Sequence, residues 1–268
     1  MKLIINEEQF SSIIKEEFGI SSKVLIASRE FYDMLANEVS AVIKTGKDNK
    51  TMKSSNGSFS YVFLGMTVEV SFEAFNFKDK DMFRYSQVHS GGKSVYVNDK
   101  TSFMWLTVPL VSGTIVKEET MDTIQHELEH IFQQKMFGNS FSDTRKYAKI
   151  ISNMHSESED ERKIANMLYG CIKSEQEGFV NGLYAYLMAL PEIFSMESLK
   201  KTPCWELYES MYKTYEEFNQ DGTLEQMLKP YGYSRKKVKT AIENFLRRIG
   251  RVVAKVKKDK YGKQGWIS

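Results

Sequence analysis

The hydrophobic periodicity of this chain changes once, at about residue 118, and this change limits what the chain can fold into. Between residues 59 and 111, apolar residues alternate with polar or small ones, which is the period of a β-strand. After Glu118 they recur every three or four positions, which is the spacing of one helix face. The sequence therefore predicts an α+β fold with a strand-rich first half and a mainly helical second half.

The same two periods give the expected elements. Strands are predicted over 23–27, 59–63, 68–72, 94–97 and 102–111. Helices are predicted over 31–43, 118–136, 142–154, 158–190, 205–219 and 234–257. Residues 45–58 are rich in Lys, Ser, Asn and Gly and are expected to form an exposed loop. Pro109 cannot donate a ladder hydrogen bond, so strand 103–111 is predicted to be an edge strand of an antiparallel or mixed sheet.

Composition limits the class of protein. The chain has 268 residues, of which 41% are hydrophobic and 27% are charged, which is typical of a globular protein and excludes a disordered one. Two cysteines, Cys171 and Cys204, are too few for a disulfide framework. No apolar run reaches the ~18 residues of a transmembrane segment. A cytoplasmic location is expected, with one domain over 1–200 and a helical, basic extension over 201–268.

Charge is distributed unevenly along the chain. Residues 229–268 hold 13 Lys and Arg residues and two acidic residues, a net charge of +11. The whole chain carries +2, so residues 1–228 carry −9. A basic segment on an acidic body can bind an anionic partner, or it can pack on that body or form a solvated face.

Residues 126–130 read His-Glu-Leu-Glu-His, and two of the four histidines fall in this motif. Positions i and i+4 share one helix face, so His126 and His130 can reach the same metal ion, and neutral imidazole suits Zn²⁺. Glu127 follows the first histidine, where its carboxylate can act as general base on a metal-bound water. Apolar residues on the other side argue against a wholly exposed helix, namely Ile124, Leu128, Ile131 and Phe132.

A third ligand is expected elsewhere, because catalytic zinc usually has three protein ligands and one open position. A histidine six residues after His130 is excluded, since Met136 stands there. The alternative is a carboxylate from a second helix, and Glu177 with Asn181 four residues later fits it. Glu177 would bind the metal, and Asn181 would form a hydrogen bond with a metal-bound imidazole.

The same segment offers other features and a rival ligand. Gly178 and Gly182 would let this helix approach the motif helix closely, since each helical glycine otherwise costs ~1 kcal/mol. Glu175 is the second choice for the third ligand; it lies about 200° around the helix from Glu177, so the two cannot both face the metal. His155 is a further candidate ligand or oxyanion stabiliser, although its place near a helix end is typical of a surface residue.

Three more residues are weighed for the site. Tyr184 and Tyr186 are candidate oxyanion donors, but aromatic residues in this helix are more typical of a core. His89 stands beside Ser90-Gly91-Gly92 and is expected to lie in a loop.

Over roughly residues 60–190 the chain resembles the gluzincin group of HExxH zinc metallopeptidases. In that group a strand layer, whose edge strand binds peptide, precedes the HExxH helix, and a later helix supplies a Glu. The Glu-x-x-x-Asn pattern is also similar to that of the ImmA/IrrE-like peptidases. The resemblance implies a zincin-like fold, with His126, His130 and Glu177 as zinc ligands and Glu127 as the base.

On this interpretation a peptide or protein substrate pairs with the edge strand, and Glu127 delivers the water proton to the leaving amine. The prediction is a zinc metalloendopeptidase. One alternative is a zincin-fold binding protein without turnover, such as a regulatory, virion-associated or mobile-element protein, although the complete motif argues against it. Another is a nucleic-acid-binding protein that uses residues 229–268, whose aromatic residues could stack on bases.

Overall fold

The computed structural model describes residues 22–43, 53–79, 82–83, 90–137, 144–190 and 195–262. The first half holds helix α2 (Ser22–Ile43) and strands β1 (Lys53–Phe63), β2 (Met66–Phe77), β3 (Gly91–Asn98), β4 (Thr101–Val111) and β5 (Thr114–Ile115). The second half holds α4 (Lys117–Phe137), α5 (Thr144–Asn153), α6 (Glu159–Gly170), α7 (Lys173–Ala189), α8 (Met196–Lys200), α9 (Pro203–Gln220), α10 (Leu224–Leu228), the 3-10 turn η2 (Lys229–Tyr231) and α11 (Arg235–Tyr261). The predicted α+β class, with helices after residue 117, is confirmed.

The strands form one mixed sheet in the order β1-β2-β4-β3, with β5 paired to β4. β1 and β2 are an antiparallel hairpin whose turn residues, Leu64 and Gly65, have φ angles of 53° and 73°. Positive φ at both positions suits the right-handed twist of the strands. β2 and β4 are parallel, whereas β3 and β4 are antiparallel.

The prediction that strand 103–111 is an edge strand is wrong. β4 lies inside the sheet between β2 and β3, and β1 and β3 are the two edge strands among the described residues. Pro109 is tolerated there because the pairing of β4 with β3 ends at Thr107, opposite Gly91. The missing N–H of Pro109 therefore breaks no bond to β3, and its carbonyl accepts a hydrogen bond from the Val116 N–H at 2.9 Å.

Three other boundaries differ from the sequence predictions. The strand predicted over 23–27 is the first part of helix α2, whose buried stripe runs on from Val24 through Phe31. Residues 53–58, predicted as loop, are strand, because they pair with β2. The helix predicted over 158–190 is two helices, since Ile172 is extended (φ −73°, ψ 125°) and interrupts the helical hydrogen bonding.

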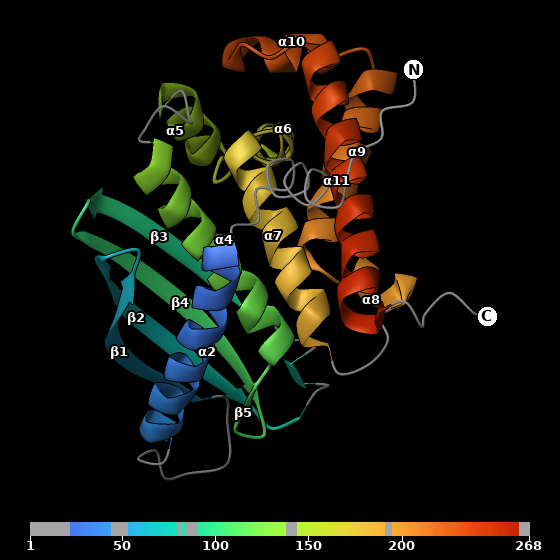
Figure 1. The fold of residues 1–268 in the computed structure, drawn as a ribbon. Helices are drawn as coiled ribbons and strands as arrows, with labels where there is room; N and C mark the ends of the chain where they lie inside the picture. The colour runs from blue at the N-terminus through green and yellow to red at the C-terminus, as the bar shows by residue number, and fades with distance from the viewer. Residues whose placement is uncertain are drawn as a thin grey trace, which may run out of the picture.

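Helices cover one face of the sheet in successive layers (Figure 1). α2 and α4 pack on the sheet, α7 packs on the far side of α4, and α9 and α11 pack on α7. One hydrophobic cluster joins the sheet to α2 and α4, and a second joins α5 through α11. The interface between α4 and α7 thus lies between two apolar cores.

The helical cluster includes the apolar stripe that the sequence predicts for the last helix: Val238, Ile242, Phe245, Ile249, Val252 and Val256. This cluster also contains residues of α6 and α7, so residues before and after position 200 pack in one core. None of the described helices combines the length and the apolar character that crossing a membrane requires.

Candidate metal centre

Helix α4 has an apolar side and a polar side, and this division positions the His-Glu-Leu-Glu-His motif. Ile124, Leu128 and Ile131 are fully buried in the cluster beneath the sheet. This confirms the apolar side that the sequence predicts. The opposite side of α4, which carries both histidines, faces α7.

The two imidazoles of the motif converge on one point. The Nε2 atoms of His126 and His130 are 2.9 Å apart, and the rings cross at 80°. The Oε2 atom of Glu175 on α7 lies 3.7 Å from the His126 Nε2 and 3.4 Å from the His130 Nε2. Within the described residues this is the one group of three His, Cys, Asp or Glu side chains whose ligand atoms all lie within 4.8 Å of one another.

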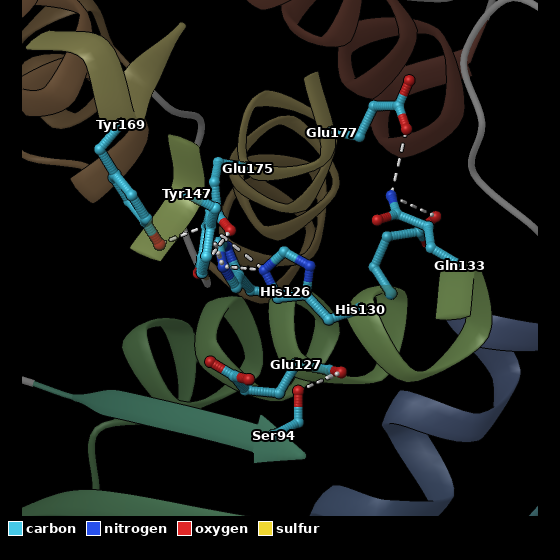
Figure 2. A network of polar contacts seen from close by, with 10 residues as sticks. Ser94, His126, Glu127, His130, Gln133, Tyr147, Tyr169, Glu175 and Glu177 are labelled. Carbon is cyan, nitrogen blue, oxygen red and sulfur yellow. Dashed lines mark hydrogen bonds and ion pairs between the residues drawn. The ribbon is translucent and has the colours of Figure 1, made fainter. Parts of the chain in front are cut away.

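Two tyrosines hold the Glu175 carboxylate (Figure 2). The Tyr147 hydroxyl on α5 donates to Oε1 at 3.3 Å, and the Tyr169 hydroxyl on α6 donates to Oε2. Glu175 is therefore buried with a partner on each oxygen. Sequence reasoning missed both tyrosines, because they come from two other helices and belong to no motif.

Glycines on α7 permit the close contact with α4, as the sequence predicts. A Cβ atom on Gly178 would lie 2.8 Å from Cε1 of His126, and one on Gly182 would lie 1.9 Å from Oδ1 of Asp122. Any larger side chain at either position would separate the two helices or displace these groups. Phe179, the residue after Gly178, packs its ring edge to face against the His126 ring, with the two ring centres 4.7 Å apart. This contact restrains the orientation of the imidazole.

Glu127 lies on the side of α4 that faces strand β3 (Figure 2). A Cβ atom on Gly92 would lie only 2.7 Å from Cγ of Glu127, so glycine is needed where the strand crosses this side chain. The Ser94 hydroxyl donates to the Glu127 carbonyl at 3.3 Å, and Ser90 bonds to Thr123 through their hydroxyls at 2.7 Å. These contacts fix the edge strand against the motif.

Glu127, the two histidines and Glu175 line a single cavity of about 420 Å³. Its other walls include Tyr147, Tyr169 and residues 92–96 of β3. A wider hollow of about 800 Å³ lies on the sheet, with Trp105 and Glu73 in its lining, and it does not include the histidines. Of these two hollows, the cavity at the motif is the one lined by both imidazoles, by carboxylates and by strand β3.

The carboxylates around the histidines favour positive charge between them. Burial lowers the pKa of His130, but the hydrogen bond with Glu175 and the charges of Glu175, Glu127 and Glu129 outweigh it and raise this pKa to about 9. Burial raises the pKa of Glu175, yet its hydrogen bonds with both histidines hold that pKa well below the usual range. A bound divalent cation would supply the same positive charge.

Two buried acids lie on the same polar side of α4. Burial, assisted by the charge of Glu119, raises the pKa of Asp122 to about 8. Burial and the charge of Glu177 raise the pKa of Glu129 to about 8 as well. Asn181 lies close enough to Glu129 to oppose that rise.

The structure arranges the two residues of the Glu-x-x-x-Asn pattern differently from the expectation. Glu177 points away from the imidazoles (Figure 2). Its carboxylate accepts a hydrogen bond from Gln133 at 3.1 Å and lies 3.7 Å from both Lys173 and Arg248. Both polar side-chain atoms of Asn181 are buried and have no hydrogen-bond partner among the described residues, so no bond to an imidazole is formed. Glu175, the second choice from sequence, occupies the place expected for Glu177.

One sequence signal could have selected Glu175. If Gly178 marks the side of α7 that touches α4, the residue three positions before it shares that side, and this residue is Glu175. Glu177 is only one position from Gly178 and is rotated by about 100°. The glycine therefore indicates which carboxylate lies beside the imidazoles better than the asparagine four residues after Glu177 does.

The remaining candidates do not line the cavity. His155 is exposed just after α5. The Tyr184 hydroxyl donates to Asp259 at 2.8 Å, and Tyr186 is buried in the helical cluster. This agrees with the expectation that these aromatic residues belong to a core. His89 lies outside the described residues.

Comparisons of the chain with models of known protein families, with curated proteins and with solved structures found no match. Function is therefore inferred from the chemistry of the site itself.

Proposed function

We propose that this protein is a zinc-dependent peptidase with His126, His130 and Glu175 as metal ligands and Glu127 as general base. The observation that carries the proposal is the convergence of three ligand atoms in a cavity that also holds the Glu127 carboxylate. A zincin-like arrangement, with an HExxH helix under an antiparallel edge strand, is part of the same proposal.

The donor set fits zinc. Two imidazoles and one carboxylate are a ligand set known from catalytic zinc sites, and they leave a fourth position open. Ligand atoms 2.0–2.2 Å from a tetrahedral zinc ion lie about 3.4 Å from one another. The three distances here, 2.9, 3.4 and 3.7 Å, bracket that value. Tyr147 and Tyr169 supply the hydrogen bonds to a ligating carboxylate that such sites commonly contain.

The residues around the cavity would have different roles in peptide-bond hydrolysis. A bound zinc ion would supply Lewis acidity and lower the pKa of a bound water. Glu127, held between α4 and β3, accepts the proton of the attacking water and passes it to the departing amine. His126 and His130 are restrained by contacts with Phe179 and Glu175.

We propose that the substrate pairs with β3 and not with β4, the strand that the sequence analysis proposed for this role. Among the described strands, β3 pairs with β4 alone, and its residues 92–96 line the cavity. An extended peptide can therefore pair with the free edge of β3 and bring a carbonyl beside Glu127. The hydrogen bonds of Ser90 and Ser94 to α4 keep this edge at a fixed distance from the base.

The test uses full-length protein supplied with zinc and a dye-labelled unfolded casein as a general probe. Parent protein should cleave the probe, and Glu127→Gln should lose at least 100-fold in rate while still binding zinc. Glu206→Gln, an exposed glutamate on α9, is the matched control and should leave cleavage unchanged.

Retention of full cleavage by Glu127→Gln would overturn the assignment of the base. A parent protein that binds zinc but cleaves neither casein nor a mixed peptide library would instead support a zincin-fold binding protein without turnover. Measuring zinc binding and cleavage together therefore tests the metal site and the proposed reaction independently.

A further inference from the structure

We propose that the exposed side of helix α11 is a nucleic-acid-binding surface that contacts the phosphate backbone without reading sequence. This surface is independent of the proposed metal site, because α7 lies between α11 and α4 (Figure 1). The inference rests on the charge, length and packing of α11.

The exposed side of α11 is strongly basic. Its exposed charged residues include two acids, Glu243 and Asp259. The exposed basic residues are Arg235, Lys236, Lys237, Lys239, Arg247, Arg251, Lys257 and Lys258. Within the described part of the chain, no carboxylate pairs with Lys236, Lys239 or Lys258. These three lysines therefore keep their positive charge on the exposed side of the helix without a paired carboxylate.

The basic side of α11 is long enough to contact several successive phosphates of a nucleic acid. Arg235 and Lys258 are 23 residues apart in one helix, which corresponds to roughly 34 Å. One turn of duplex DNA has about this length. An acidic patch on a typical folded protein has no comparable run of evenly spaced charges, so a nucleic-acid backbone fits the helix best.

The packing of α11 argues against a membrane surface as the partner. A helix that lies in a membrane interface buries its apolar side among the lipids. The apolar side of α11 is already in the protein core, where Val238, Phe245 and Val252 are fully buried. The exposed side alone remains for binding, and phosphate contacts need nothing else.

Gly250 gives a second, independent observation. It is exposed in the middle of α11, and a Cβ atom added there would meet no atom within 4 Å. Glycine weakens a helix interior relative to alanine, and here no internal contact requires it. Its place between Arg247 and Arg251 leaves room for a ligand backbone to approach the helix.

Lysines of α5 extend the basic surface at the start of α11. The Lys149 ammonium donates to the Pro230 carbonyl at 2.9 Å and lies 5.2 Å from the centre of the Tyr231 ring. A Cβ atom on Gly232 would lie 3.5 Å from Cε of Lys146. Lys146, Lys149 and Lys229 are all exposed, so positive charge surrounds the segment that leads into α11.

The test measures binding of full-length protein to a fluorescent 20-base-pair DNA duplex and a 30-nucleotide single strand, each of mixed sequence, from 50 to 300 mM NaCl. Parent protein should bind with an affinity that falls steeply with salt, and its logarithmic slope should reflect about four or more phosphate contacts. The variant Lys236→Gln/Lys239→Gln/Arg247→Gln/Lys258→Gln should bind at least tenfold more weakly at 100 mM NaCl and show a shallower slope.

A matched control removes the same number of charges elsewhere. Lys78→Gln/Lys100→Gln/Lys200→Gln/Lys201→Gln changes exposed lysines outside α11 and should bind nearly as well as the parent. Gly250→Leu keeps the charge but fills the gap on the helix, and it should also weaken binding. Zinc content and circular dichroism should be the same in all variants, which separates this inference from the metal site.

Several results would overturn the proposal. They are absence of binding to either nucleic acid at 50 mM NaCl, an equal loss in the matched control, and binding to phosphatidylserine vesicles without binding to nucleic acid. Salt-sensitive self-association in sedimentation, without nucleic-acid binding, would assign the basic side to contacts between copies of the chain and would also overturn it.

Discussion

The Cα atom of Gly178 faces the imidazole of His126 so closely that a Cβ atom there would lie 2.8 Å from Cε1, 2.9 Å from Nδ1 and 3.1 Å from Nε2 of the ring. This contact lets α7 press on α4 at the first histidine of the motif. It also sets the position of Glu175, which is one helical turn before Gly178 on the same side of α7. The geometry of the proposed metal site therefore depends on a residue that has no ligand atom.

Gly178→Ala tests this dependence. Alanine should favour the helix by ~1 kcal/mol in isolation, but its methyl group must displace the His126 ring or the whole of α7. We expect zinc affinity, measured by competition with a chromophoric chelator, to fall at least tenfold. Gly250→Ala is the control, since that site is open; it should stabilise the protein slightly and leave zinc affinity unchanged. Unchanged zinc affinity in Gly178→Ala would contradict the close packing.

Tyr169→Phe tests the support of Glu175. The substitution removes the hydroxyl that donates to Oε2, the oxygen nearer to both histidines. Loss of such a hydrogen bond to a ligating carboxylate typically costs 10- to 100-fold in metal affinity, roughly 1.4 to 2.7 kcal/mol. Tyr212→Phe, at a 48% exposed tyrosine on α9, should have no effect in the same chelator competition. Equal zinc affinities in the two variants would show that Tyr169 does not position the ligand.

Asp122→Asn tests the cost of the buried acid on α4. The pKa of Asp122 is raised from 3.8 to about 8, chiefly by burial and then by the charge of Glu119. A raised pKa means that the folded state binds the proton more tightly, so this contribution to stability is complete below pH 3.8 and is lost as the pH rises through 8. Asparagine cannot ionise, so the variant should exceed the parent in free energy of unfolding by on the order of 5 kcal/mol at pH 8.

The measurement for Asp122→Asn is urea unfolding of the metal-free protein at pH 4, 6 and 8. The advantage of the variant should shrink as the pH falls and should nearly vanish at pH 4. An advantage that is constant with pH would mean that Asp122 is already ionised, or always neutral, across this range. An exposed acid on the same chain, Asp221→Asn, is the control and should show no such trend.

The parts of the structure that sequence could predict are those fixed by local periodicity. The i, i+4 pair of His126 and His130, the apolar side of α4 and the stripe of α11 all follow from spacing within one helix. The edge position of β3 could not be predicted, because the local effect of Pro109 depends on where the neighbouring strand ends. Strand order is a property of the whole sheet, and no segment of the chain encodes it alone.

The third ligand of the proposed metal site was difficult to choose from sequence for a related reason. Glu175 and Glu177 are both compatible with a helix, and the choice between them depends on the rotation of α7 about its own axis. That rotation is set by packing against α4 through Gly178 and Gly182, and by tyrosines on α5 and α6. A short Glu-x-x-x-Asn pattern carries no information about these contacts.

The central claim is that Glu175, together with His126 and His130, binds zinc. The most direct test is elemental analysis of the purified chain, loaded with zinc and dialysed, for the parent, Glu175→Gln and Glu177→Gln. The account predicts one zinc ion per chain in the parent and in Glu177→Gln, and a strong loss in Glu175→Gln. Loss in Glu177→Gln with full retention in Glu175→Gln, or no zinc in the parent, would contradict it.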